Sequence, residues 1–250
     1  EKTAAVIVQS PNIWGQIEDW DGCFSVVHEE PKVAAIAVFN PIASGLLKTP
    51  GECGADIAAG EGQSLGNSLS LGGPYLGLLA AKRSYMRKMP GRLVGMTADQ
   101  DDRRAFCLTL QTREQHIRGA KATSNVCTNQ GLMALRASMF MTSLGSIGLK
   151  EMATQCWHKA HYLANSIAQL DGWSLKFNGP FFNEFTVVCP IPVTEVVERG
   201  KSNGMLVGVS ATGRRLRSLS NGDDLIIAVT EKRTKLEMDE LLALFKEISA

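Results

Sequence analysis

The chain has 250 residues, and its 26 lysines and arginines balance 25 aspartates and glutamates to a net charge of +1. That balance gives no global field that would recruit nucleic acid or an anionic membrane surface. A hydrophobic content of 44% is ordinary for a globular protein, and it is enough for a sizeable core in one large domain or in a large and a small one.

The cysteines exclude two further classes of protein. They lie at Cys23, Cys53, Cys107, Cys127, Cys156 and Cys189. Because no two form a Cys-x-x-Cys pair, the spacing argues against a zinc site and a disulfide framework, and we expect reduced thiols in the cytoplasm. No apolar run approaches the roughly 20 residues that span a bilayer, and no signal peptide precedes the first strand. We therefore expect no membrane partner.

The first sixty residues predict a parallel sheet. Strands are expected at 4–9, 33–39 and 57–59, with a helix at 17–28. Continuous apolar strands separated by a helix are typical of a parallel sheet covered on both faces. Residues 10–12 and Asn40-Pro41 follow two of these strands at the edge where such sheets collect ligands, although residues of this kind also simply end strands. A chain that opens on a core strand without a Met looks like a fragment of a longer polypeptide.

A glycine-rich segment from Gly60 to Gly77 invites a dinucleotide-binding interpretation, which we reject. That motif needs a helix opening at the glycines and an acidic residue about 20 positions later. Here Gly72-Gly-Pro interrupts the segment, and Lys82 and Arg83 stand at that distance. The remaining elements predicted in this half are an antiparallel strand at 75–81, a short basic turn or helix at 82–88, and a hairpin of strands 92–96 and 105–110 around a polar loop at 99–102.

A polar stretch, Lys121 to Gln130, lies directly before an apolar helix predicted at 129–144. Free backbone N–H groups and the helix dipole suit an anion at such a place, and phosphate is the usual one. The alternative is that Thr128 or Asn129 merely caps the helix, while residues 123–125 form a polar turn. The residues alone leave both interpretations open. Just upstream, Thr112-Arg-Glu-Gln115 has the spacing of a capping box and predicts a short helix.

A second helix is predicted at 149–170, and it carries Cys156, His158 and His161. Only the two histidines share a face, and two imidazoles without a third ligand are a weak metal signal, so we expect solvated helix residues. After Asp171-Gly172 the pattern changes to strands at 173–177 and 184–189, a helix at 194–199, strands at 205–209 and 225–229, and a closing helix from Thr234. We predict part of a large, mostly parallel-sheet domain at 1–170 and a small α+β domain at 171–250.

The most distinctive stretches are Pro41 to Asp56, Gly60 to Gln63, Leu71 to Gly77, Arg87 to Arg92, Arg113 to Arg118, Lys121 to Gln130, Asn178 to Phe185 and Val229 to Thr234. Together they resemble the P-proteins of the glycine cleavage system, and within them the first subunit of the two-subunit glycine dehydrogenase. The resemblance covers nearly the whole chain. It implies the α/β, aspartate-aminotransferase-like fold of type I pyridoxal-phosphate transferases, with the large domain truncated at its N-terminus and a small C-terminal domain.

The resemblance also makes a demand on the glycine-rich turn. A pyridoxal-phosphate enzyme holds its cofactor as a Schiff base to a lysine. The equivalent place here falls at about Gln63 or Ser64, and the sequence has no lysine between Lys48 and Lys82. The implied arrangement is that a lysine-bearing partner subunit holds the pyridoxal 5'-phosphate, while this chain supplies no catalytic residue.

In this arrangement Thr123 and Ser124 contact the phosphate of the partner's cofactor across the interface, and Asn125 holds the turn. The same interface would be lined by Arg113, His116 and Arg118. The assembled enzyme would decarboxylate glycine and pass the aminomethyl group to the lipoyl arm of H-protein. Two alternatives stay open: a structural or regulatory scaffold subunit without an active-site contribution, and a self-sufficient pyridoxal-phosphate enzyme.

Overall fold

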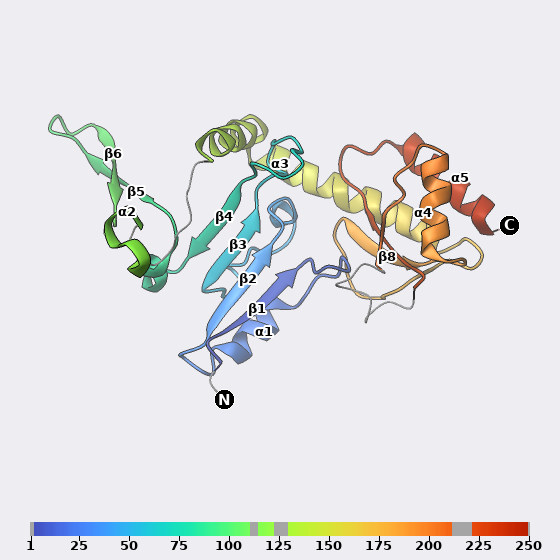
Figure 1. Cartoon of the computed structure of the whole chain (residues 1–250), viewed down its shortest axis with the longest axis horizontal. Coiled ribbons are helices and arrows are strands. Elements are labelled where there is room, and N and C mark those ends of the chain that lie inside the picture. Colours follow the sequence, from blue (N-terminus) through green and yellow to red (C-terminus); the bar gives the residue numbers. More distant parts are fainter. Residues whose placement is uncertain (1–2, 111–114, 123–129, 212–221, 250) are drawn as a thin grey trace.

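The computed structural model describes residues 3–110, 115–122, 130–211 and 222–249. Figure 1 shows two sheets joined by one long helix, with a hairpin projecting from the side of the first sheet that lies away from the second. The first sheet contains β1 (Ala5–Ser10), β2 (Ala34–Phe39), β3 (Ile57–Glu61) and β4 (Gly77–Ala81) in that spatial order. Strands β1, β2 and β3 are parallel, and β4 is antiparallel to β3, as predicted.

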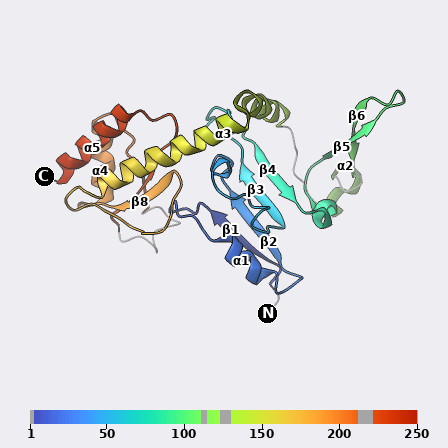
Figure 2. The same ribbon diagram turned by 180° about the vertical axis from the view of Figure 1, so that it is seen from behind.

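Helix α1 (Trp20–Val27) covers one face of this sheet (Figure 2). Its buried side chains Trp20 and Phe24 pack with Ala35 and Ala37 of β2. The helix begins later than predicted because the Ile17 N–H donates to the carbonyl of Pro180 (2.8 Å), which holds the preceding residues against the second sheet. The N-terminus of the helix is then capped by Asp19, whose Oδ1 accepts from the Gly22 N–H (3.0 Å).

The middle of the chain leaves the first sheet. It contains the 3-10 turns η1 (Ala43–Gly45), η2 (Arg83–Lys88) and η4 (Gly119–Lys121), the strands β5 (Leu93–Ala98) and β6 (Arg104–Thr109), and α2 (Gln115–Arg118). Strands β5 and β6 pair in an antiparallel hairpin around the polar loop, as predicted. The capping box proposed at Thr112 lies outside the described residues.

One helix, α3 (Gly131–Ile167), stands where two were predicted. It bends at Gly145, whose φ of 63° and ψ of −175° are not helical, so two helical halves are present without a loop between them. Of the described helices, α3 is the one that is long and apolar enough to cross a membrane by length and composition. Polar residues such as Thr142, Ser143 and Ser146 interrupt its apolar positions, so the sequence has no uninterrupted apolar run there. Its first half is tied to the first sheet, because Arg136 Nε donates to the Gly66 carbonyl (2.7 Å).

The second sheet has the order β7-β8-β10-β9 and is antiparallel throughout. Its elements are β7 (Ser174–Leu175), β8 (Glu184–Val188), α4 (Val193–Ser202), β9 (Val209–Ser210), β10 (Asp224–Ala228) and α5 (Lys235–Ser249). The end of α3 contributes Leu163 and Ile167 to the core of this unit, beside Phe185 and Phe245. The boundary between residues 170 and 171 stays a prediction.

Two details of this unit follow from local hydrogen bonds. The predicted capping box at the start of α5 is confirmed, since the Thr234 N–H donates to Glu237 Oε2 (2.7 Å) and the Glu237 N–H donates to Thr234 Oγ1 (3.2 Å). Strand β9 was predicted at 205–209 but pairs only at Val209 and Ser210. The reason is that the Met205 N–H donates back to the Gly200 carbonyl (2.9 Å), which makes this segment part of the turn after α4.

A buried carboxylate, Asp56, stabilises the amino end of β3. It accepts from Lys82 Nζ (2.8 Å) and from the Ala35 N–H (2.9 Å), and it lies 3.3 Å from His28 Nε2. Burial pushes the pKa of Asp56 upward, but the hydrogen bonds from Lys82, Ala35 and His28 outweigh burial and leave the pKa below its ordinary value.

We therefore expect Asp56 to stabilise the fold at neutral pH and to lose this contribution in acid. Because the folded-state pKa is lowered, the stabilisation is complete above the unfolded-state value, about 4. It disappears as the pH falls through the lower, folded-state value. Urea unfolding between pH 7 and pH 3 measures this. The Asp56→Asn variant should be less stable at pH 7 and should show a flatter decline below pH 4, and an equally steep decline would contradict the assignment.

Candidate functional site

The carboxyl ends of β1, β2 and β3 lie close to residues 183–184 at the start of β8. Two adjoining clefts of about 320 Å³ and 400 Å³ lie there, and Asn40, Gln63, Ser64 and Asn183 line both. The larger cleft extends to Thr230-Glu-Lys232 and to the first half of α3. This is the edge at which the sequence predicted a site, and parallel sheets bind ligands beyond the carboxyl ends of their strands.

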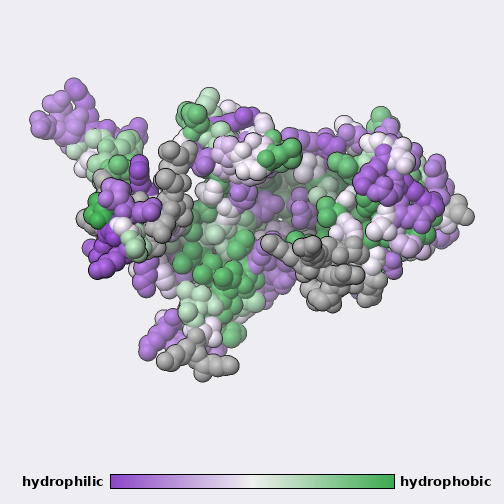
Figure 3. All heavy atoms as spheres, viewed as in Figure 1, coloured by the Kyte–Doolittle hydropathy of each residue, from purple (hydrophilic) through white to green (hydrophobic). Residues whose placement is uncertain are grey.

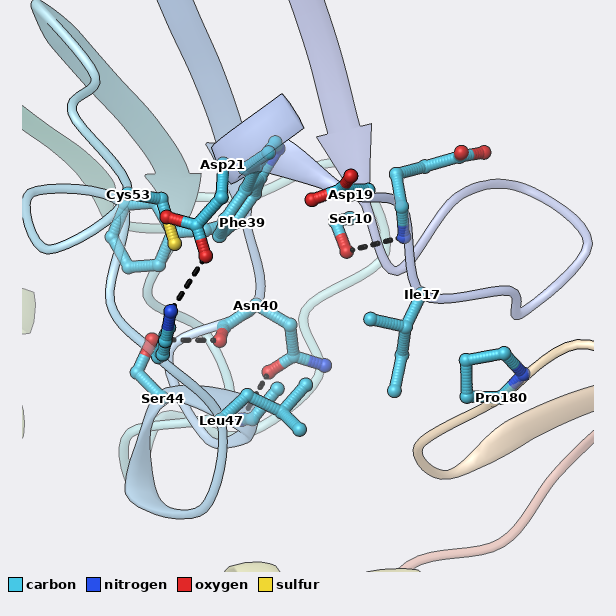
Figure 4. A pocket seen from close by; sticks show the side chains of 14 residues that line it. Ser10, Ile17, Asp19, Asp21, Phe39, Asn40, Ser44, Leu47, Cys53 and Pro180 are labelled. Carbon is cyan, nitrogen blue, oxygen red and sulfur yellow. Dashed lines mark hydrogen bonds and ion pairs between the residues drawn. The ribbon is translucent and has the colours of Figure 1, made fainter. Parts of the chain in front are cut away.

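The residues at the ends of β1 and β2 are used to build turns. Ser10 Oγ accepts from the Glu18 N–H (3.0 Å), and Asn40 Oδ1 accepts from the Ile42 N–H (2.9 Å) at the start of η1. Figure 4 shows the bond between Ser10 and Glu18 beside a third cavity, of about 330 Å³. Its walls are mainly apolar, and the ion pair between Lys48 and Asp21 (2.6 Å) forms part of its lining. The strand-end interpretation therefore accounts for the hydrogen bonds of Ser10 and of the Asn40 oxygen.

The glycine-rich turn after β3 is held in one conformation by side chains. Glu61 Oε1 accepts from the N–H groups of Gln63 (2.9 Å) and Leu76 (3.1 Å). Gln63 Nε2 in turn donates to the Asn67 carbonyl (2.6 Å). Ser64 is exposed and lines both clefts. An amide and a hydroxyl at this position can hydrogen-bond to a ligand, but neither can condense with an aldehyde.

The larger cleft is lined by two cationic side chains, Arg136 and Lys232, that the sequence did not indicate as site residues. Arg136 donates from Nε to the Gly66 carbonyl (2.7 Å) and from a terminal nitrogen to Ser68 Oγ (3.1 Å). Lys232 is exposed and lines the same cleft from the loop before α5. The stretch Val229 to Thr234 carried part of the resemblance. Nothing in its spacing indicated that Lys232 lines the larger cleft.

The buried thiol of Cys156 lines the same cleft. Cys156 Sγ lies 3.5 Å from Glu231 Oε2 and accepts from the Glu231 N–H (3.2 Å). Burial raises the pKa of Cys156 to about 11. Its contacts with Glu231 connect α3 to the loop before α5. Because the neutral thiol is a poor nucleophile, this cysteine is not set up for covalent chemistry.

The predicted phosphate contacts Thr123, Ser124 and Asn125 lie outside the described residues, as does Arg113. The helix cap proposed at Thr128 or Asn129 lies outside them too. His116 and Arg118 are described, and both are exposed on α2 near the base of the hairpin. Their predicted place at an interface stays a prediction.

The two histidines of α3 differ from each other. His158 is exposed, as expected. His161 was expected to be solvated, and this was wrong: it stacks on Phe181 with ring centroids 4.0 Å apart and lies within hydrogen-bond distance of the Trp157 carbonyl (2.8 Å). Burial lowers the pKa of His161. Within the described ranges, no group of three or more His, Cys, Asp or Glu side chains could hold a metal ion.

Comparisons with known proteins bear on this arrangement. The sequence profile of the family described as "Glycine cleavage system P-protein" matches residues 1–245. The probable glycine dehydrogenase (decarboxylating) subunit 1 of Chloroherpeton thalassium is 49% identical over 99% of this chain and 54% of its own length. The protein of the same name from Thermomicrobium roseum is 45% identical over 100% of this chain and 55% of its own length. The chain spans about half the length of these curated relatives.

Solved structures agree with the fold. A crystal structure of glycine decarboxylase (P-protein) of the glycine cleavage system, in inhibitor-bound form, has a TM-score of 0.90 at 39% identity, over 98% of this chain and 55% of that chain. A NifS-like protein from Rickettsia africae has a TM-score of 0.68 at 10% identity over 98% of this chain and 61% of its own, a likeness that shows the fold alone. These matches confirm the predicted α/β, aspartate-aminotransferase-like fold.

Proposed function

Because the chain belongs to the family of glycine cleavage system P-proteins, we propose that it forms part of subunit 1 of a glycine dehydrogenase (decarboxylating). In this proposal a lysine-bearing second subunit holds pyridoxal 5'-phosphate, and this chain helps to complete the site around it. When bound, that cofactor supplies the electron sink for glycine decarboxylation. The assembled enzyme passes the aminomethyl group to the lipoyl arm of H-protein, and we place it in the cytoplasm.

The observation that carries the proposal is the chemistry at the carboxyl edge of β3. Gln63 and Ser64 occupy the place at which the resemblance expects the tethering lysine, and hydrogen bonds from Gln63 fix the turn. The nearest lysines on either side in sequence are Lys48 and Lys82. Both pair with carboxylates elsewhere, with Asp21 and Asp56 respectively. The lining of the clefts therefore suits hydrogen bonds to a ligand but gives no tether on this turn.

The proposed contribution of this chain lies in the segment between α2 and α3. Thr123 and Ser124 would donate hydroxyl hydrogen bonds to the phosphate of the partner's cofactor, and Asn125 would hold their turn. Support comes from sequence: these residues lie six to eight positions before Gly131, the first residue of α3, and the free N–H groups at the N-terminus of a helix favour an anion. The scaffold alternative keeps the partner but gives these hydroxyls no role.

The test uses the chain together with its lysine-bearing subunit in a glycine–bicarbonate exchange assay. For Thr123→Ala we expect an intact complex with exchange reduced at least about tenfold, the cost of removing one hydrogen bond to a charged group. Thr154→Ala is the matched control, since its hydroxyl donates to the Lys150 carbonyl within α3 (2.8 Å). Unchanged exchange in Thr123→Ala would favour the scaffold alternative.

Lys232 makes the self-sufficient alternative directly testable. It is the lysine among the described residues that lines the larger cleft. If this chain held the cofactor itself, adding pyridoxal phosphate to the isolated chain and reducing with borohydride would attach the cofactor covalently to the protein. Lys232→Arg would then abolish the cofactor absorbance that stays with the protein. We expect no specific fixation on the isolated chain and fixation on the second subunit of the complex.

A further inference from the structure

Two buried asparagines on the walls of the larger cleft have polar groups without a partner in the described part of the chain. Asn67 is 5% exposed and Asn183 is 8% exposed, and both line this cleft. Asn67 Oδ1 accepts no hydrogen bond from a described residue, and none joins the Asn183 side chain to another of these residues. The other polar side chains buried to this degree all have partners: Ser10, Asp56, Thr186 and Asp224. Because buried polar groups are normally hydrogen-bonded, two exceptions at one cleft indicate a place for a ligand.

The contacts of Asn67 show which kind of group its oxygen lacks. Asn67 Nδ2 lies 3.4 Å from the Gly62 carbonyl oxygen and 3.5 Å from the Met133 carbonyl oxygen. The amide nitrogen therefore faces two acceptors, and Oδ1 is left as an acceptor without a donor. The Asn183 amide can both donate and accept, and Ser64 adds an exposed hydroxyl group to the lining. The cleft thus suits a ligand that carries a hydroxyl or amino group.

The charges that line the larger cleft favour a ligand with one negative charge. Arg136 donates to two uncharged groups, the Gly66 carbonyl and Ser68 Oγ. Within the described ranges, neither Arg136 nor Lys232 forms an ion pair. Glu231 is the carboxylate in this lining, so two cations against one anion leave a net charge of +1. A carboxylate ligand balances that charge, whereas a phosphate ester carries about −1.5 to −2 near pH 7.

The size and walls of the cleft indicate an organic ligand rather than a bare ion. Its volume of about 400 Å³ has room for a small molecule, and Ile42, Phe140 and Phe182 supply apolar walls. Figure 3 shows the apolar surface of the first sheet giving way to hydrophilic residues on the side toward the second sheet. A ligand in this cleft contacts the turn after β3, α3 and the loop before α5 at once, so its binding stabilises their arrangement.

We propose that the larger cleft binds, without a covalent bond, a small organic monocarboxylate that also carries a hydroxyl or amino group. The carboxylate pairs with Arg136 and Lys232, and the hydroxyl or amino group donates to Asn67 Oδ1. The inference goes beyond the proposed function, because this site belongs to the chain itself and needs neither a partner subunit nor a tethering lysine. The single charge of a carboxylate also distinguishes this ligand from a phosphate-bearing cofactor.

The test titrates the full chain with matched probes and follows binding by saturation-transfer NMR. The probes are 2-hydroxybutyrate, butyrate, which lacks the hydroxyl group, and inorganic phosphate. We expect the dissociation constant of 2-hydroxybutyrate to be about fivefold or more below that of butyrate, the effect of one hydrogen bond. Inorganic phosphate should bind more weakly than 2-hydroxybutyrate, because it does not match the charge or the apolar walls of the cleft.

Three variants connect the binding to this cleft. Lys232→Gln removes a charge from an exposed loop residue and should raise the dissociation constants of both carboxylates about tenfold or more. Lys32→Gln is the matched control, because Lys32 is exposed and lies outside the lining of both clefts. Its dissociation constants should stay within about twofold of wild type. Asn67→Leu, which keeps the side-chain size, should remove the preference for 2-hydroxybutyrate and leave butyrate binding within about twofold of wild type.

Several results would overturn the inference. It fails if neither carboxylate binds, if Lys232→Gln binds 2-hydroxybutyrate as tightly as Lys32→Gln does, or if Asn67→Leu keeps the preference for the hydroxyl group. It also fails if inorganic phosphate or pyridoxal phosphate displaces 2-hydroxybutyrate at a lower concentration than butyrate does, since the cleft would then belong to a phosphate-bearing ligand. Because the titration uses this chain without the second subunit, absence of carboxylate binding leaves the proposed function standing. Failure of the two subunits to associate likewise leaves the inference standing.

Discussion

Replacing Gly15 by alanine should lower the free energy of unfolding by about 3 kcal/mol or more. Gly15 has a φ of +86°, and a Cβ built on it would lie 2.1 Å from the Glu184 carbonyl oxygen. The close approach exists because the loop after β1 packs against β8. In this contact the Thr186 hydroxyl donates to the Trp14 carbonyl (3.0 Å). A methyl group at residue 15 must therefore push β8 away from the loop. The alanine backbone would also be held in the left-handed region, which is strained for any residue with a Cβ.

Urea unfolding followed by tryptophan fluorescence measures the loss. Gly51→Ala is the matched control, because nothing lies within 4 Å of its Cβ position and its φ is not in the left-handed range. We expect that control to change stability by less than about 0.5 kcal/mol. If Gly15→Ala unfolded at the same urea concentration as Gly51→Ala, the contact between the loop and β8 would not be a tight one.

The contact at Gly15 shows what the sequence could not reveal. Except for β9, the strands of both sheets follow from apolar runs and alternation, and the capping box at Thr234 follows from spacing. Those signals are local. The Ile17–Pro180 and Thr186–Trp14 hydrogen bonds join residues about 160 positions or more apart, so no pattern within a short window encodes them. The Ile17–Pro180 bond accounts for the later start of α1, and both bonds join the loop after β1 to the second sheet.

The candidate site was predictable to a similar degree. The carboxyl edge of the sheet was expected from strand order, and Gln63 and Ser64 were placed by resemblance. Lys232 and Arg136 were not expected, because each reaches the cleft from a different element brought there by tertiary packing. His161 was misjudged for the same reason: the Phe181 ring that covers it comes from a loop 20 residues later. Helical spacing gives the face of a side chain, but it does not say what packs on that face.

The second large effect is expected at the ion pair between Lys176 and Asp224. The side chains are only 17% and 3% exposed. Asp224 lies at the start of β10, and Lys176 follows β7. The Lys176 ammonium also lies 4.7 Å from the centre of the Trp14 ring, so it connects the second sheet to the loop that contains Gly15. Within the described part of the chain, this is the one ion pair that Asp224 forms.

Lys176→Met should therefore lower the free energy of unfolding by about 3–5 kcal/mol, because it keeps the side-chain volume but removes the cation beside a buried carboxylate. Glu195→Gln breaks the exposed pair with Arg199 and is the matched control, with an expected loss within about 1 kcal/mol. Adding Asp224→Leu to Lys176→Met should recover most of the stability, since a buried pair can be replaced by apolar side chains at little cost. If the single variant were as stable as Glu195→Gln, the buried carboxylate would need another source of compensation. Recovery in the double variant would instead show that the loss comes from the unpaired carboxylate and not from the missing contact with Trp14.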